Sequence, residues 1–93
     1  MLFFVFHTDR PDAGDLRART REAHLEYLGG FDVRVGGPTL SDDGETMNGT
    51  VLILDAPDRA AADAFVAGDP YVQAGVFDQT VVRPWRQVVL RGE

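Results

Sequence analysis

Few residues of this chain could do chemistry at neutral pH: two histidines, His7 and His24, with carboxylates, hydroxyl groups and arginines around them. The chain has no cysteine, which excludes thiolate nucleophiles, thiolate metal sites and disulfides. Its nine cationic residues are all arginine, so the lysine amine that Schiff-base chemistry needs is absent. Two histidines do not make a convincing zinc site, and we expect no metal and no cofactor. Acid–base chemistry by a histidine remains.

His24 lies in the segment REAHLEYL of a predicted helix. The helical spacing of Leu16, Ala23 and Tyr27 marks the centre of the expected buried face, and His24 falls about 60–80° from that centre at ~100° per residue. A histidine at this margin meets both core and cleft, where it can act as a general base. The simpler interpretation is an amphipathic histidine at the edge of the core.

Asp69 precedes Pro70 at the expected end of the second helix. An Asp–Pro pair is a common N-cap and first residue of a helical turn. The functional alternative is a carboxylate that orients a histidine, as in a catalytic triad. Periodicity does not place Asp69 near His24, but two helices on one face of a sheet would allow the contact.

Three further residues are candidates for substrate binding. Tyr71 is one of several aromatic residues that could wall a pocket or simply fill the core. Ser41 lies in a predicted turn after Gly36-Gly37-Pro38, and such loops can line clefts. His7 stands near the end of the first strand, where the simpler interpretation is a solvated edge residue.

Length and charge limit the classes of protein. With 93 residues the chain is one domain, 1–93, whose own core is marginal. The N-terminus MLFFVFHTDR has no basic residue before its apolar run, so we expect a strand rather than a signal peptide, in a soluble cytoplasmic protein. No apolar run approaches the ~20 residues of a membrane span. The net charge of −6 and the scattered arginines argue against a nucleic-acid partner.

The pattern of apolar and turn residues predicts the order strand, helix, strand, strand, helix, strand. The expected strands are 2–8, 31–40, 48–55 and 76–90, with Gly36-Gly37-Pro38 distorting or ending the second and Pro84 at a bulge or edge of the last. The helices are expected from Pro11-Asp12 to Gly29-Gly30 and from Pro57-Asp58 to Asp69-Pro70, followed by a short turn at 71–75. This βαββαβ order is typical of an α+β, ferredoxin-like fold, with a four-stranded antiparallel sheet and both helices on one face.

The other face of that sheet would be bare. The first and third strands are apolar on both sides, and two helices cover one side. Soluble monomers rarely expose a large apolar patch, so we expect a homodimer packed sheet to sheet.

Several short motifs, taken together, resemble the YCII-related family. They are Ala23-His24-Leu25, Gly37-Pro38, Asp43-Gly44, Ala64-Phe65, Asp69-Pro70-Tyr71, Ala74-Gly75-Val76 and Pro84-Trp85. The resemblance implies a ferredoxin-like fold that dimerises into an α+β barrel. It also implies an active site around a His–Asp pair, matched by His24 and Asp69. In that family, some members are similar in fold to muconolactone isomerases, and one type eliminates chloride from a chlorinated hydroxyquinol.

Two hypotheses of function remain open. The first is a small cofactor-independent lyase or isomerase acting on an aromatic or enol-like substrate, with His24 as general base and acid and Asp69 orienting it. The alternative is a non-catalytic module of the same fold that binds a small ligand or serves dimerisation or regulation. A haem- or oxygen-linked monooxygenase has support from fold analogy alone.

Overall fold

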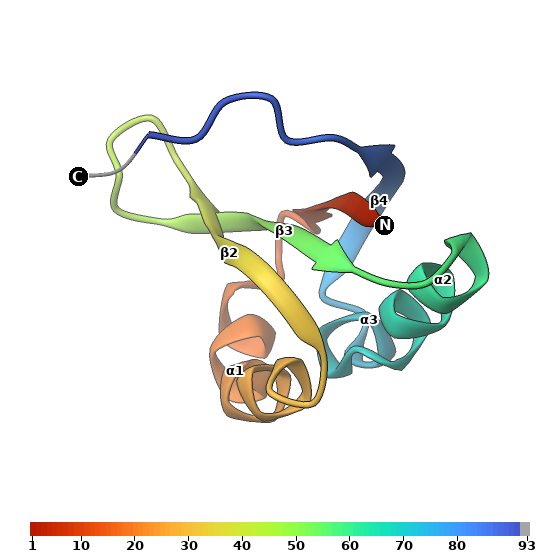
Figure 1. The fold of residues 1–93 in the computed structure, drawn as a ribbon. Helices are drawn as coiled ribbons and strands as arrows, with labels where there is room; N and C mark the ends of the chain where they lie inside the picture. The colour runs from red at the N-terminus through yellow and green to blue at the C-terminus, as the bar shows by residue number, and fades with distance from the viewer. Residues whose placement is uncertain (92–93) are drawn as a thin grey trace.

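A computed structural model describes residues 1–91 (Figure 1). The elements, in chain order, are β1 (Leu2–Asp9), α1 (Gly14–Leu28), β2 (Asp32–Leu40), β3 (Met47–Asp55), α2 (Arg59–Gly68), α3 (Pro70–Ala74) and β4 (Phe77–Trp85). No helix in this part of the chain is long and apolar enough to cross a bilayer.

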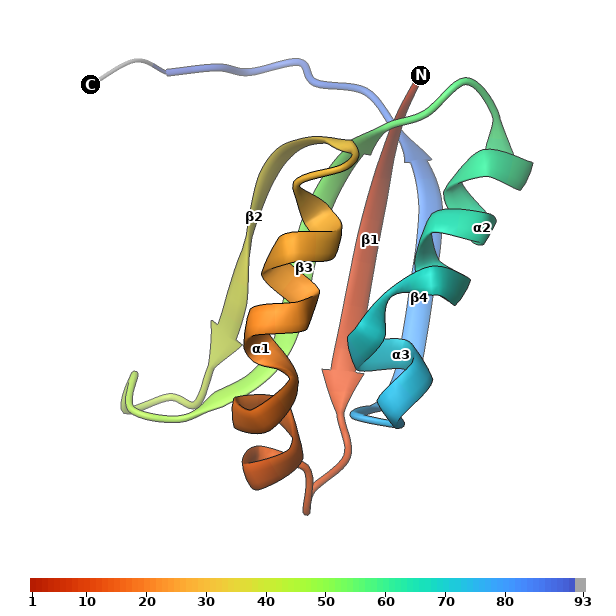
Figure 2. The ribbon, with the colours of Figure 1, turned by 90° about the horizontal axis from the view of Figure 1, so that it is seen from below.

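The four strands form one sheet in the order β2-β3-β1-β4, and every neighbouring pair is antiparallel. Figure 2 shows all three helices on the same face, with α1 beside α2 and α3. The predicted ferredoxin-like α+β fold is confirmed. Because α1 and α3 share this face, residues far apart in the sequence meet between them.

The core lies between the sheet and the helices. In β1 the buried residues Phe3, Val5 and His7 alternate with the half-buried Leu2, Phe4 and Phe6. The pleat places these two sets on opposite faces. On the helix side, Phe3 and Val5 form a core cluster with residues of β3, of the β3–α2 connection and of α2: Leu52, Leu54, Ala56, Ala62 and Phe65.

The end of α2 is fixed by local chemistry. Asp69 has an extended backbone, and its side chain accepts a hydrogen bond from the backbone N–H of Tyr71, which starts α3 with Pro70 at its first position. Gly75, with φ of 81°, ends α3 in the left-handed conformation that suits glycine. The predicted break at Asp69-Pro70 therefore lies at the α2–α3 junction.

The expected second strand, 31–40, agrees with β2, but Gly36-Gly37-Pro38 does not end it. The strand continues through Gly36 and Pro38 because it is an edge strand and one side of its backbone needs no partner, and its register shifts earlier, between Val33 and Val35. The expectation for the last strand was wrong in extent. β4 ends at Trp85, and residues 86–91 leave the sheet. The apolar Val88, Val89 and Leu90 are exposed there rather than paired in a strand.

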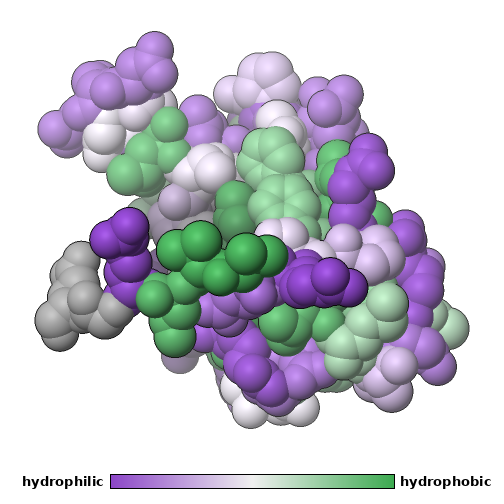
Figure 3. All heavy atoms as spheres, turned by 45° about the horizontal axis from the view of Figure 1, so that its top comes forward, coloured by the Kyte–Doolittle hydropathy of each residue, from purple (hydrophilic) through white to green (hydrophobic). Residues whose placement is uncertain are grey.

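The face of the sheet opposite the helices carries apolar side chains in register. Phe4 is opposite Ile53, and Phe6 lies between Val51 and Val81. Figure 3 shows apolar surface on this side of the molecule and on the C-terminal segment that crosses it. Val81 is 36% exposed, and the other four residues are half-buried.

Candidate active site

The structure brings His24 of α1 and Asp69 of the α2–α3 junction together. His24 Nδ1 and Asp69 Oδ1 are 2.8 Å apart, and the side chains are 5% and 0% exposed. A carboxylate oxygen only accepts, so Nδ1 carries the proton and donates it. The lone pair of this tautomer is on Nε2, which has no hydrogen-bond partner within residues 1–91.

One oxygen of Asp69 accepts two hydrogen bonds. Besides that of His24, Oδ1 accepts the backbone N–H of Tyr71 at 2.9 Å, so the oxygen that caps α3 is also the partner of the histidine. The ring of Tyr71 stacks on His24, with 3.9 Å between ring centroids and 17° between planes. The imidazole is thus fixed in orientation by a hydrogen bond and a stacked ring.

Arg17, also on α1, ties this helix to the sheet. Its Nε donates to Asp9 Oδ2 at 2.7 Å, and its Nη2 donates to the carbonyl of Gly49 at 2.7 Å and to Thr50 Oγ1 at 2.5 Å. The Arg17 and Asp9 side chains are 7% and 6% exposed. The guanidinium also lies 4.8 Å from the centroid of the Tyr71 ring. This buried ion pair sets the distance between α1 and the sheet beside His24.

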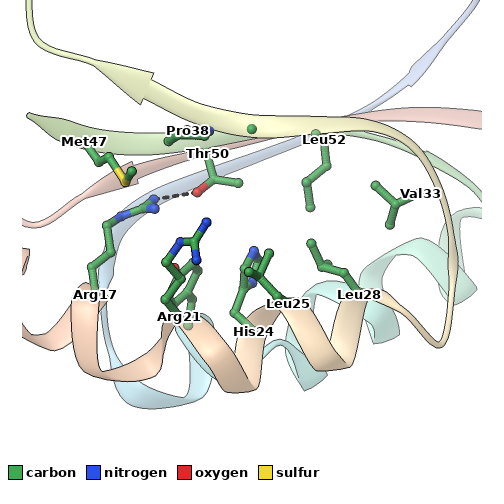
Figure 4. A pocket seen from close by; sticks show the side chains of 13 residues that line it. Arg17, Arg21, His24, Leu25, Leu28, Val33, Pro38, Met47, Thr50 and Leu52 are labelled. Carbon is green, nitrogen blue, oxygen red and sulfur yellow. Dashed lines mark hydrogen bonds between the residues drawn. The ribbon is translucent and has the colours of Figure 1, made fainter. Parts of the chain in front are cut away.

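A cavity of about 280 Å³ lies between α1 and strands β2 and β3. Figure 4 shows the His24 imidazole standing from α1 into it, with Arg17 and Arg21 to one side and the apolar Leu28, Val33 and Leu52 to the other. Tyr71 also lines it, as do the backbones of Gly36 and Gly37. The cavity places the free Nε2 side of the imidazole against an apolar-walled space.

The inward face of α1 is centred differently from the prediction. Arg17 and His24 are the buried residues of α1, while Ala23 is exposed and Leu16 and Tyr27 are half-buried. The prediction took small and apolar side chains as the buried stripe. Arg17 is buried because Asp9, Gly49 and Thr50 satisfy its guanidinium.

His7 is fully buried, which overturns the interpretation of a solvated strand end. Its Nδ1 is 2.8 Å from Thr80 Oγ1, and its ring stacks on Phe77 at 4.0 Å. Burial lowers the pKa of His7 to about 4, against the opposing charge of Asp69. His7 does not line the cavity; its Nε2 and Asp69 Oδ2 are both buried without a partner among residues 1–91.

Of the other two candidates for substrate binding, Tyr71 lines the cavity, whereas Ser41 does not. Ser41 stabilises the β2–β3 turn, where its hydroxyl donates to Asp43 Oδ1 at 2.6 Å and accepts the backbone N–H of Thr46 at 3.1 Å. The turn signal explains Ser41 fully.

The sequence analysis did not single out two arginines that line the cavity, Arg17 and Arg21. Arg17, Arg21 and His24 follow one another at intervals of four and three residues, which places their side chains on one side of a helix. That spacing was the available signal. Within residues 1–91 no three His, Cys, Asp or Glu side chains converge as a metal site.

The fold and site define a small ferredoxin-like protein with a His–Asp pair beside a cavity. Residues 1–86 match the YCII-related domain, and the chain belongs to this family. An uncharacterised protein of Haemophilus influenzae is 30% identical over 97 residues, covering 95% of this chain and 99% of that protein. Protein YciI of Escherichia coli is 29% identical with the same coverage.

Solved structures agree with this assignment. The 5-chloro-2-hydroxyhydroquinone dehydrochlorinase TftG of Burkholderia phenoliruptrix, in complex with 2,5-dihydroxybenzoquinone, is 36% identical, with a TM-score of 0.87 and coverage of 95% of this chain and 96% of that one. An antibiotic biosynthesis monooxygenase is similar in fold, with a TM-score of 0.58 at 20% identity, covering 96% of this chain and 100% of that one.

Proposed function

We propose that this protein is a cofactor-independent lyase or isomerase that performs acid–base chemistry on a small aromatic or enol-like substrate. The observation that carries the proposal is the hydrogen bond between His24 Nδ1 and Asp69 Oδ1 at the wall of the cavity. The similarity to a dehydrochlorinase of a hydroxylated hydroquinone supports the same class of substrate.

His24 is the proposed base and acid. Its Nε2 takes a proton from a hydroxyl group or an acidic carbon of the substrate, and Asp69 stabilises the imidazolium that results. The electron pair left on the substrate either expels a leaving group such as chloride or takes up a proton at another carbon. In elimination one proton and one chloride leave together, so no oxidant or reductant is required.

The cavity favours a ligand of one ring. Its volume of about 280 Å³ is small, since ligand pockets usually span roughly 300–1,000 Å³. Leu28, Val33 and Leu52 offer apolar contact to a ring.

A homodimer is part of the proposal. The cross-strand apolar residues Phe4, Phe6, Val51, Ile53 and Val81 share the sheet face that no helix covers. A second copy packed on this face would bury them. The cavity lies on the opposite, helix-bearing side and would stay accessible.

Turnover of chlorinated hydroxyhydroquinones tests the proposal. Chloride release and quinone absorbance should rise with the wild-type protein and fall at least about 100-fold with His24→Gln, because general acid–base catalysis contributes 10²–10⁴-fold. Glu26→Gln, an exposed change on the same helix, should leave turnover unchanged. Binding of these compounds without turnover by the wild type would favour the alternative, a non-catalytic ligand-binding module.

A further inference from the structure

Arg21 is a cation of the cavity that the proposed acid–base chemistry does not use. Its side chain lines the cavity, and Figure 4 shows its guanidinium beside that of Arg17, turned toward the sheet. The Arg17 guanidinium already donates hydrogen bonds to Asp9, Gly49 and Thr50. Within residues 1–91, Arg21 makes no hydrogen bond or ion pair.

Among the described residues, no carboxylate pairs with Arg21 or lines the cavity beside it. The residues three and four positions away on α1 are Arg17, Ala18, His24 and Leu25. Arg21 is exposed, as are Arg19 and Arg59, but those two are paired: Arg19 with Asp15 at 3.0 Å and Arg59 with Asp63 at 3.0 Å. None of the cavity-lining residues in the described chain is acidic. Of the two guanidinium groups in the lining, that of Arg17 is paired with Asp9, which leaves Arg21 as the cation available to a ligand among the described residues.

We infer that Arg21 is a specificity-determining residue that binds an anionic oxygen of the ligand, so that the substrate class is planar, ionised phenols, enols or carboxylates. This inference rests on the proposed function, since it takes the cavity beside His24 as the ligand site. A guanidinium presents a planar fork of donors that matches two neighbouring oxygens of such an anion. The apolar side chains of Leu28, Val33 and Leu52 supply contact for its ring.

The position of Arg21 also suits the chemistry. When His24 Nε2 removes a proton, negative charge develops on the substrate and spreads to its conjugated oxygens. A guanidinium that already faces the cavity stabilises that charge without rearrangement, which is the most effective form of electrostatic catalysis. Arg21 then favours both the ionised ligand and the deprotonated intermediate.

Binding of two uncomplicated probes tests the role of Arg21. The first is 2,5-dihydroxybenzoquinone, whose hydroxyl groups are vinylogous acids and are ionised at neutral pH; the second is hydroquinone, which is uncharged at that pH. Calorimetric titration should show that Arg21→Gln lowers the affinity for the anion about tenfold or more, because a hydrogen bond to a charged group is worth ~1.5–3 kcal/mol. Hydroquinone binding should change less than about twofold, since no ionic contact is lost.

The matched control is Arg19→Gln, which removes the same charge from the same helix at a solvent-exposed pair. It should leave anion binding as in the wild type. Arg21→Lys keeps the charge without the fork and should fall between the wild type and Arg21→Gln. Equal anion affinity in wild type and Arg21→Gln, equal losses for both probes, or no anion binding by the wild type would each overturn the inference.

Turnover separates this inference from the proposed function. His24→Gln should abolish turnover yet retain Arg21-dependent anion binding. If the anion binds through Arg21 while no phenol or enol is turned over, the inference stands and the proposed function fails. If Arg21→Gln turns over ionised substrates like the wild type, the inference fails and the proposed function stands.

Discussion

His24 and Asp69 are 45 residues apart in the chain, yet one buried hydrogen bond of 2.8 Å joins them. The same carboxylate oxygen caps α3 by accepting the N–H of Tyr71. The capping hydrogen bond therefore helps to orient the carboxylate that binds the imidazole. This dual use makes Asp69 testable by a substitution that keeps the cap and removes the charge.

Asp69→Asn should keep the fold and lose turnover. Asparagine caps helices about as well as aspartate. Its amide does not stabilise an imidazolium as a carboxylate does, so turnover should fall at least about 100-fold. Asp58→Asn, at the cap of α2 where Asp58 accepts the N–H of Ala61, is the matched control and should keep full turnover. Chloride release and circular dichroism measure both; normal turnover in Asp69→Asn would contradict the role of the pair.

Asp9→Asn should destabilise the protein strongly. It leaves the buried Arg17 guanidinium without its counter-charge, at a cost of about 3 kcal/mol in free energy of unfolding. Asp15→Asn breaks the exposed pair with Arg19 and should cost less than about 1 kcal/mol. Urea unfolding of the two variants compares the costs, and similar values for both would show that burial of the Arg17–Asp9 pair adds nothing.

The pH dependence of stability should report His7. Burial lowers its pKa to about 4 from 6.5, so the unfolded chain takes up this proton at higher pH than the folded protein does. The contribution of neutral His7 is complete above pH 6.5 and is lost as pH falls toward 4, by about 3 kcal/mol.

Urea unfolding between pH 4 and 7 measures this loss. His7→Gln is the control, because glutamine can keep a hydrogen bond to Thr80 and does not titrate. The difference in slope between wild type and His7→Gln isolates His7. Parallel slopes would mean that His7 titrates normally in the folded protein.

The cavity should depend on the missing side chain at Gly36. A Cβ there would lie 2.7 Å from Cδ2 of Leu52, which lines the cavity. Gly36→Val should fill this space and weaken 2,5-dihydroxybenzoquinone binding about tenfold, since excluded volume removes ligand contacts. A Cβ on Gly37 meets nothing within 4 Å, and adjacent strand residues point to opposite faces, so Gly37→Val is the control. Equal affinities in the two variants would place the ligand elsewhere.

Sedimentation should give a mass of about twice the 10.2 kDa of the chain at micromolar concentration. Ile53→Glu places a charge in the centre of the uncovered sheet face and should yield monomers. Ala18→Glu, on the exposed side of α1, should not. A monomeric wild type would rule out the sheet-to-sheet dimer.

Local patterns in the sequence predicted most of the fold. The continuous apolar run of β1, the Asp–Pro and Pro–Asp helix boundaries and the turn at Ser41–Gly44 are short-range effects, and they predicted the order and approximate bounds of the elements. The end of β4 at Trp85 was missed because it depends on where strand pairing stops, which is a property of the assembled sheet.

For the site, too, some features could be predicted from the sequence and others depended on tertiary contacts. The residue types of His24, Asp69 and Tyr71 and their placement on adjacent helices could be read from the chain, because acid–base chemistry needs those groups and the fold brings the helices together. Whether Arg17 is buried, whether Arg21 faces a cavity and whether His7 is sealed in the core depended on their neighbours. A charged side chain is buried only where distant residues satisfy it, as Asp9, Gly49 and Thr50 do for Arg17. That tertiary arrangement leaves Arg21 at the cavity without a partner among residues 1–91.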